Sequence, residues 1–188
     1  SDKSFKGFYT VKDFMEVEPQ PGSIISNVIR WAQYYKLNRP DSLISPLAAA
    51  DTLNYYARMA FINLKSLPQR KINSSDELDL TLGDIEAFAT LGNYYAEKIR
   101  GACSLALYNF YGVKQDQDEA IQHLTNAKSY WTKYAAIYSS QYKPALFNRV
   151  GFVNIPQLIE KTDQDINIAI NWQPGTIKEY KKGKIIYP

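Results

Sequence analysis

The sequence predicts an all-α protein: a four- to five-helix antiparallel bundle around one long central helix, with irregular amino- and carboxy-terminal arms. Two observations carry this prediction. Residues 78–111 contain no proline and place apolar side chains around most of a helical circumference, which is typical of a helix that several neighbours bury. Prolines separate further segments with the same periodicity. The predicted core stripe of the central helix is Ile85, Phe88, Gly92, Tyr95, Ile99, Ala102 and Ala106.

The amino-terminal arm, residues 1–22, is expected to be irregular because two prolines and a glycine stand at its end. We expect this arm to lie on the domain or to link it to a preceding part of the chain. The bundle domain is predicted over residues 23–173. Ser23 is the expected N-cap of its first helix, which should end before Pro40.

Ser45 and Pro46 are typical of a helix start, because serine is a favoured N-cap and proline suits the first helical position. This second helix should end at Pro68. Gly92 and Ala96 form a shallow groove on the central helix, so we expect the second helix to cross there at short distance. The predicted core stripe of the second helix is Ala49, Leu53, Tyr56, Ala60 and Leu64, with Met59 alongside.

Three further segments complete the predicted fold. Gly112 should end the central helix, and Asp116 or Asp118 is the expected N-cap of the next helix. A last helix is expected to begin near Pro156. Residues 174–188 form the predicted tail, whose weak alternation of apolar residues favours either a strand or a loose segment.

Composition and charge exclude several classes of protein. Hydrophobic residues make up 45% of the 188, which is in the globular range. The net charge is only +3, and basic and acidic residues are interspersed, unlike the clustered charge of a nucleic-acid-binding protein. We recognise no transmembrane stretch and no signal peptide. Because the chain begins at Ser1 without an initiator methionine, we interpret it as a processed or excised protein.

Residues that bind metals or act as nucleophiles are scarce. Cys103 is the single cysteine and stands among apolar residues, so we expect a small buried side chain rather than a reactive thiol. His123 is the single histidine, with Glu119 one helical turn earlier. We expect these two to form a helical Glu–His pair rather than a metal site. No glycine-rich phosphate loop is present, so the sequence predicts neither a metal nor a cofactor.

Paired carboxylates are the one catalytic possibility that the sequence leaves open, since glycosidases use two of them. Two groups qualify by proximity: Asp79, Asp84 and Glu86, and then Asp163 with Asp165. Carboxylates near helix ends more often cap the helix or pair with lysine and arginine. We therefore predict structural roles for both groups and assign no catalytic residue.

Aromatic side chains suggest a second kind of site, a platform on which sugar rings stack. Tyr130, Trp131 and Tyr134 are the candidate ligand-binding residues. Their helical spacing is more simply explained as core and core rim. Both interpretations stay open on the sequence.

Two resemblances add context. Residues 107–127 resemble one tetratricopeptide unit, with Leu107 and Tyr111 on its first-helix positions and Ala120, Leu124 and Ala127 on its second-helix positions. No repeat of 34 residues flanks this segment, whereas a peptide-binding array needs about three units. A wider resemblance, carried by residues 45–51, 80–85, 91–102, 127–134 and 148–151, is to the helical carboxy-terminal region of large bacterial glycoside-hydrolase-like proteins.

This wider resemblance implies a catalytic barrel of α-glucuronidase-like or hexosaminidase-like type upstream, in a secreted or periplasmic parent that acts on polysaccharide. The chain itself is then expected to be a non-catalytic accessory domain, supporting the catalytic domain or a contact between copies in a homo-oligomer. Two alternatives stay open. One is a tetratricopeptide-like protein-interaction module, and the other is a free-standing carbohydrate-binding domain.

Overall fold

The computed structural model of the chain describes residues 8–20, 22–39, 41–67, 76–147 and 151–180. These residues are mainly helical, and the prediction of an all-α protein with a long central helix is confirmed. The helices are α1 (Val11–Glu16), α2 (Val28–Lys36), α3 (Pro46–Ser66), α4 (Asp76–Tyr111), α5 (Lys114–Gln141) and α6 (Ile159–Ile170). The strands β1 (Ala145–Phe147) and β2 (Gly151–Val153) form an antiparallel pair, and a 3-10 turn, η1 (Pro156–Leu158), precedes α6.

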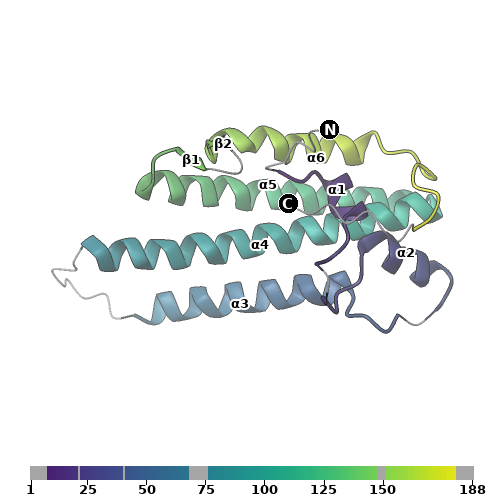
Figure 1. Ribbon diagram of the computed structural model, residues 1–188, viewed down its shortest axis with the longest axis horizontal. Helices are drawn as coiled ribbons and strands as arrows, with labels where there is room; N and C mark the ends of the chain where they lie inside the picture. Colours follow the sequence, from purple (N-terminus) through teal and green to yellow (C-terminus); the bar gives the residue numbers. More distant parts are fainter. Residues whose placement is uncertain (1–7, 21, 40, 68–75, 148–150, 181–188) are drawn as a thin grey trace.

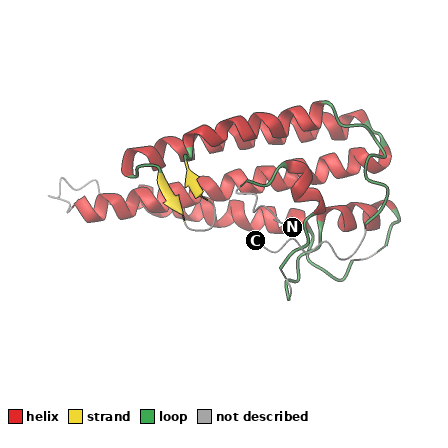
Figure 2. Cartoon of the chain, turned by 45° about the horizontal axis from the view of Figure 1, so that its top comes forward, coloured by secondary structure: helices red, strands yellow, loops and turns green. Residues whose placement is uncertain are grey.

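The four longest helices lie side by side in chain order, each antiparallel to the next (Figure 1). Helix α4 has α3 on one side and α5 on the other, and α6 packs against α5. The two short helices α1 and α2 both pack against α4 and cover the layer near one end. The strand pair lies near the opposite end of the molecule (Figure 2).

Local chemistry explains where α3 begins and ends. The Ser45 hydroxyl accepts a hydrogen bond from the backbone N–H of Ala48 at 3.1 Å, and Pro46 occupies the first helical position. The helix ends at Ser66, two residues before Pro68. The predicted cap and the predicted stop are both confirmed.

The start of α2 corrects a prediction, because Asn27 and not Ser23 is the N-cap. The Asn27 side chain accepts from the backbone N–H of Arg30 at 3.0 Å and donates to the Val17 carbonyl at 2.7 Å. It therefore satisfies a free helix donor and ties the preceding arm at the same time. Ile25 lies before the helix and forms a parallel bridge with Ile44.

Asp116 and Asp118 are also not caps. Helix α5 begins at Lys114, and its N-cap residue, Val113, makes no side-chain hydrogen bond. The turn before it depends on Gly112, which has a φ of +69° and donates its N–H to the Tyr108 carbonyl at 2.8 Å. This residue in left-handed conformation ends α4 as predicted, and only Val113 separates it from the start of α5.

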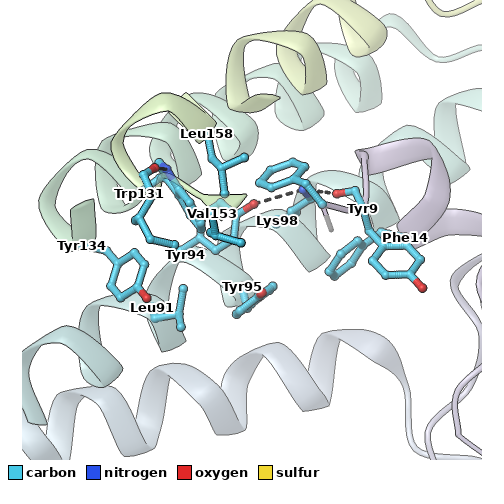
Figure 3. A pocket seen from close by; sticks show the side chains of 12 residues that line it. Tyr9, Phe14, Leu91, Tyr94, Tyr95, Lys98, Trp131, Tyr134, Val153 and Leu158 are labelled. Atoms are coloured by element: carbon cyan, nitrogen blue, oxygen red, sulfur yellow. Dashed lines mark hydrogen bonds between the residues drawn. The ribbon is translucent and has the colours of Figure 1, made fainter. Parts of the chain in front are cut away.

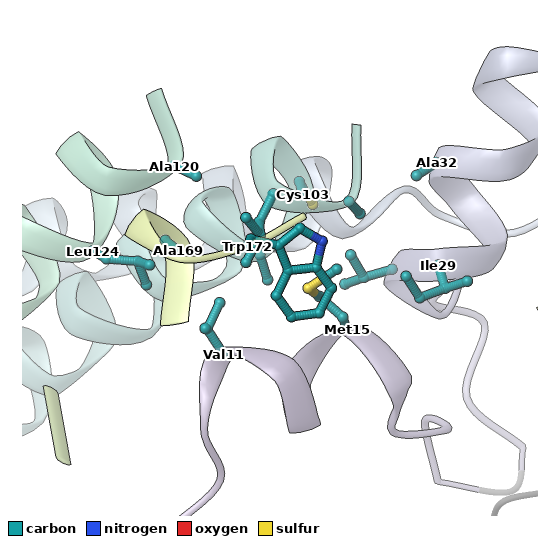
Figure 4. Packing of buried hydrophobic residues seen from close by; sticks show 13 residues of the cluster. Val11, Met15, Ile29, Ala32, Cys103, Ala120, Leu124, Ala169 and Trp172 are labelled. Atoms are coloured by element: carbon teal, nitrogen blue, oxygen red, sulfur yellow. The ribbon is translucent and has the colours of Figure 1, made fainter. Parts of the chain in front are cut away.

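The amino-terminal arm contains a helix, although the sequence predicts irregular structure there. Thr10 and Asp13 form a reciprocal capping box at the start of α1. Val11 and Met15, one turn apart, are fully buried in the main core (Figure 4). A single apolar turn is enough to order this segment because it packs on α4.

The tail beyond α6 is held by Asn109 of α4. Its side chain accepts from the backbone N–H of Ile177 at 3.0 Å and donates to the Ile177 carbonyl at 2.7 Å. The buried Trp172 ring also donates to Asn109, at 3.2 Å. The described tail residues are bonded to a helix side chain and form no strand, and residues 181–188 lie outside the described residues.

The main core joins α1, α2, α4, α5 and α6, and nearly half of its buried residues are alanine or cysteine (Figure 4). Cys103 is buried in it, as predicted, and burial raises the pKa of its thiol. Helices α4 and α5 approach closely at Gly101, where an added Cβ would lie 2.8 Å from the Leu124 side chain. Small residues therefore set the spacing of these two helices.

The prediction that the apolar stripe of α4 is buried in the core is wrong for the amino-terminal half of this helix. Phe88 is 72% exposed, and Ile85 is exposed as well. Tyr56 and Met59 on α3 are also exposed. These side chains lie on faces of α3 and α4 that no further helix of the described chain covers, so only part of each apolar surface is buried.

Candidate functional site

A pocket of about 410 Å³ opens between the amino-terminal segment, α4, α5 and the β2–η1 connection. We call it the aromatic pocket, because rings dominate its lining (Figure 3). The amino-terminal segment and α4 supply Phe8, Tyr9, Phe14, Leu91, Tyr94, Tyr95 and Lys98, whereas α5 and the β2–η1 connection supply Trp131, Tyr134, Val153, Ile155 and Leu158. Its volume falls in the range of small-molecule sites, roughly 300–1,000 Å³.

Helical periodicity explains how two helices line one pocket. Leu91, Tyr94 and Lys98 follow at intervals of three and four residues, so their side chains share one face of α4. Trp131 and Tyr134 do the same on α5. The antiparallel packing of α4 and α5 brings these two faces together.

The structure brings two of the three predicted platform residues into this pocket. Trp131 is only 5% exposed, and its indole donates to the Ile155 carbonyl at 3.3 Å. Edge-on contacts with Phe8 and Tyr94, at centroid distances of 5.8 and 4.9 Å, cover its ring. Tyr134 is half-buried and lies 5.4 Å from Trp131.

Tyr130, the third predicted residue, does not line the pocket. It packs against the same aromatic cluster from another side of α5, with the Lys133 ammonium 5.4 Å from its ring centroid. Adjacent residues on a helix point about 100° apart, so Tyr130 and Trp131 do not present one flat surface.

Lys98 is the polar centre of the pocket, and the sequence analysis missed it. Its ammonium donates to the Tyr9 carbonyl at 2.6 Å, to the Tyr94 hydroxyl at 3.0 Å and to the Asp165 carboxylate at 2.8 Å. These three acceptors use all three donors of the ammonium. The Phe8 ring lies 4.0 Å away, in cation–π geometry.

Asp165, on α6, forms the ion pair with Lys98. Its second carboxylate oxygen accepts from the backbone N–H of Val11 at 2.7 Å. The Lys98 and Asp165 side chains are 1% and 3% exposed, so the ion pair is removed from water. The pair therefore connects α4, α6 and the amino-terminal segment at one buried point.

Burial works against ionisation of both partners. It lowers the pKa of Lys98 and raises the pKa of Asp165, while the opposite charge of each partner opposes these shifts. Burial also raises the pKa of Tyr94, which keeps its hydroxyl protonated beside Lys98. The pH range in which both members of the pair are charged is narrower than for the two groups in water.

A sequence signal for Lys98 exists but is weak. A lysine one turn after Tyr94, on an apolar helix face, needs a buried partner. That partner lies on another helix, and only the packing of α6 over the pocket identifies it as Asp165.

His123 has a different partner from the one predicted. Its Nδ1 lies 2.9 Å from a carboxylate oxygen of Glu97 on α4, whereas Glu119 accepts from Gln115 on its own helix. Burial alone raises the pKa of Glu97, but hydrogen bonds from His123 and Asn126 and the charge of Arg100 lower it below its ordinary value. Packing of α5 on α4 favours this long-range pair over the local one.

Asp84, Asp163 and Asp165, from the two carboxylate groups that the sequence left open, each make structural contacts. Asp84 accepts from Gln141 at 3.0 Å and from the Tyr142 hydroxyl at 2.7 Å. Asp163 binds Lys128 at 2.6 Å. Asp163 is half-exposed, whereas Asp165 is buried against Lys98, so these two carboxylates take part in separate ion pairs.

Two further observations concern the described residues only. Among them, no three or more His, Cys, Asp and Glu side chains gather in a way that could hold a metal ion. None of the helices in those same ranges combines the length and the apolar character needed to cross a lipid bilayer.

Comparison with protein-family models, with curated proteins and with solved structures gives no match for this chain.

Proposed function

We propose that this chain is a non-catalytic helical accessory domain of a polysaccharide-degrading glycoside hydrolase, and that it holds the catalytic domain in a defined position. The sequence resemblance to the helical carboxy-terminal region of glycoside-hydrolase-like proteins supplies the context. The periplasmic or extracellular location and the upstream catalytic domain belong to this proposal and rest on that resemblance.

The observation that supports it best is the anchoring of residues 8–16 to the body of the domain. The buried Lys98 and Asp165 bind the backbone at Tyr9 and Val11. Val11 and Met15 are buried in the core on the same segment. A segment held at several buried points transmits orientation, whereas a flexible linker does not.

The placement of the carboxylates agrees with an accessory role. Asp84, Asp163 and Asp165 each bind partners from other parts of the fold, and these contacts connect α4 with the α5 terminus, α5 with α6, and α6 with α4. Their contacts stabilise the helical layer. In this proposal the catalytic acids lie in the upstream domain.

Kinetics on the parent enzyme and on the isolated chain test the proposal. We expect the parent enzyme without this domain to keep turnover of aryl glycosides and to lose stability or turnover on the polymer. The isolated chain should turn over neither substrate. Hydrolysis of an aryl glycoside by the isolated chain, lost in Asp84→Asn or Asp163→Asn, would contradict the proposal.

A second candidate function, carbohydrate binding, is favoured by the aromatic pocket itself. Tyr95 and Tyr134 lie at its lining with part of their rings exposed, and stacking on such rings is a common way to bind sugars. Titration of the chain with oligosaccharides, followed by tyrosine and tryptophan fluorescence, tests this function. Tyr134→Ala should weaken binding, and Tyr130→Ala, outside the pocket, is the matched control. Equal affinities of the two variants would exclude the pocket as the site.

A further inference from the structure

The face of α3 that points away from α4 carries a regular stripe of exposed side chains. We call it the α3 seam. Its largest members, Tyr55, Met59 and Ile62, are 58%, 37% and 46% exposed. The α3 seam consists of Ala48, Thr52, Tyr55, Met59, Ile62 and Ser66. Its spacing alternates between four and three residues, as the apolar positions of a coiled-coil seam do.

The seam lies opposite the buried face of α3. Ala50 and Ala57 are buried in the contact with α4, and both are half a turn away from the seam. Helix α3 is the edge member of the helical layer (Figure 1). With 21 residues it is about 31 Å long, so it offers a straight edge several turns in length.

We propose that the α3 seam is the contact between two copies of this chain, in which the two α3 helices pack antiparallel about a two-fold axis that passes between Tyr55 and Met59. A stripe with alternating four- and three-residue spacing fits another helix with the same spacing better than it fits a flat or irregular surface. In this arrangement Tyr55 of one copy packs against Met59 of the second copy, and Thr52 packs against Ile62.

The charged residues beside the seam favour a second copy of this chain as the binding partner, and they favour the antiparallel orientation. One flank of the seam carries Asp51, Arg58 and Lys65 at intervals of seven residues. In an antiparallel pair this flank faces itself, so Asp51 of each copy lies opposite Lys65 of the other. Arg58 meets its own counterpart near the axis, which leaves two attractive pairs against one repulsive pair.

A parallel pair lacks this complementarity. It would place the charged flank opposite the other flank of the seam, which carries Tyr56 and Asn63. Asp51 keeps its bond to Arg100 within the chain at 2.7 Å, yet its side chain is largely exposed and has a second oxygen for Lys65. The inference is independent of the proposed function, because it concerns association of this chain alone.

Sedimentation equilibrium of the full chain tests the proposal. The unchanged chain should be a dimer at concentrations where Met59→Glu is a monomer, with the dissociation constant raised by about 100-fold or more. Lys161→Asp, an exposed charge change on α6, should leave the dimer unaffected. Far-UV circular dichroism should show equal helix content for all three proteins, which establishes that Met59→Glu is folded.

Charge exchange tests the direction of the pair. Asp51→Lys and Lys65→Asp each create two like-charged contacts in a homodimer, so each should dimerise roughly tenfold more weakly. An equimolar mixture of the two variants restores both opposite-charge contacts, and a heterodimer should form. A control mixture of Lys161→Asp with Asp51→Lys restores only one of the two opposite-charge contacts, so its heterodimer should be weaker than that of the charge-exchanged pair.

Three results would overturn the proposal. One is a monomeric unchanged chain up to about 1 mM. Another is a dimer that survives Met59→Glu, which would place the contact elsewhere. The last is failure of the charge-exchanged mixture to associate when both variants are folded, which would assign the seam to a different partner or to a parallel pair.

Discussion

Gly92 of α4 lies directly against Ala57 of α3. A Cβ atom added to Gly92 would be 3.7 Å from the Ala57 Cβ and 3.7 Å from the Leu53 carbonyl oxygen. The predicted close crossing of the two helices at Gly92 is therefore confirmed. The gap is an ordinary van der Waals contact, so one methyl group fits there without displacing α3.

Gly92→Ala should stabilise the protein. The methyl group fits, and replacing a helical glycine by alanine contributes up to about 1 kcal/mol. At 3.7 Å from its nearest neighbours the added methyl group meets no crowding that would cancel this gain. Gly92→Leu should still cost about 1–3 kcal/mol, because its longer side chain meets α3. Urea denaturation of the two variants measures both effects, and equal stability of Gly92→Leu and the parent would contradict the crossing.

Gly101→Ala should destabilise the protein, in contrast to Gly92→Ala. Its new Cβ would lie 2.8 Å from the Leu124 Cγ, and Leu124 is almost fully buried between helices. Overpacking of about 1–3 kcal/mol should exceed the gain in helix propensity. The Gly92→Ala variant is the matched control on the same helix. If Gly101→Ala were as stable as Gly92→Ala, α5 would not press on α4 at this point.

Removing either member of the buried ion pair should destabilise the protein strongly. Lys98→Met leaves the Asp165 carboxylate buried without its partner, and Asp165→Leu does the same to the Lys98 ammonium. Each change should cost about 3–5 kcal/mol, and the double variant should cost clearly less than the sum. A double-mutant cycle by chemical denaturation measures the coupling. Additive effects would mean that the two groups do not interact in solution.

Glu97 should make stability depend on pH in the acid range. Its pKa in the folded protein lies below the ordinary value of 4.5. A lowered carboxyl pKa contributes stability that is present above the unfolded value and is lost as the pH falls through the folded value. The stability gap between the parent and Glu97→Gln should therefore shrink as the pH is lowered from 7 to below 4.5. Urea titrations at several pH values measure this gap, and a constant gap would contradict the shift.

Trp131→Ala should unfold or strongly destabilise the protein, because the ring is buried among Phe8, Tyr94 and Tyr134. A loss of about 3–5 kcal/mol is expected for a buried large aromatic side chain. Tyr130→Ala, at the neighbouring and more exposed position, should lose much less. Thermal melting of the two variants makes the comparison. A Trp131→Ala protein with unchanged melting would identify the ring as a ligand platform rather than core.

Local signals in the sequence determined the order and the type of the long helices. Ser45 with Pro46 defines a helix start, and Gly112 defines a helix end, because each depends on the conformation of one or two residues. The absence of proline over residues 78–111 predicts the long helix α4, and helical periodicity predicts the burial of Cys103. These features need no knowledge of which helix packs on which.

Only the tertiary structure decided which apolar faces are covered and which polar groups meet. Phe88 has the spacing of a core residue, but no helix of the described chain covers it. Nothing in the sequence pairs Lys98 with Asp165, and His123 pairs with Glu97 in preference to its helical neighbour. The physical reason is that periodicity sets the direction of a side chain within its own helix, whereas burial and ion pairing depend on the helix that packs opposite.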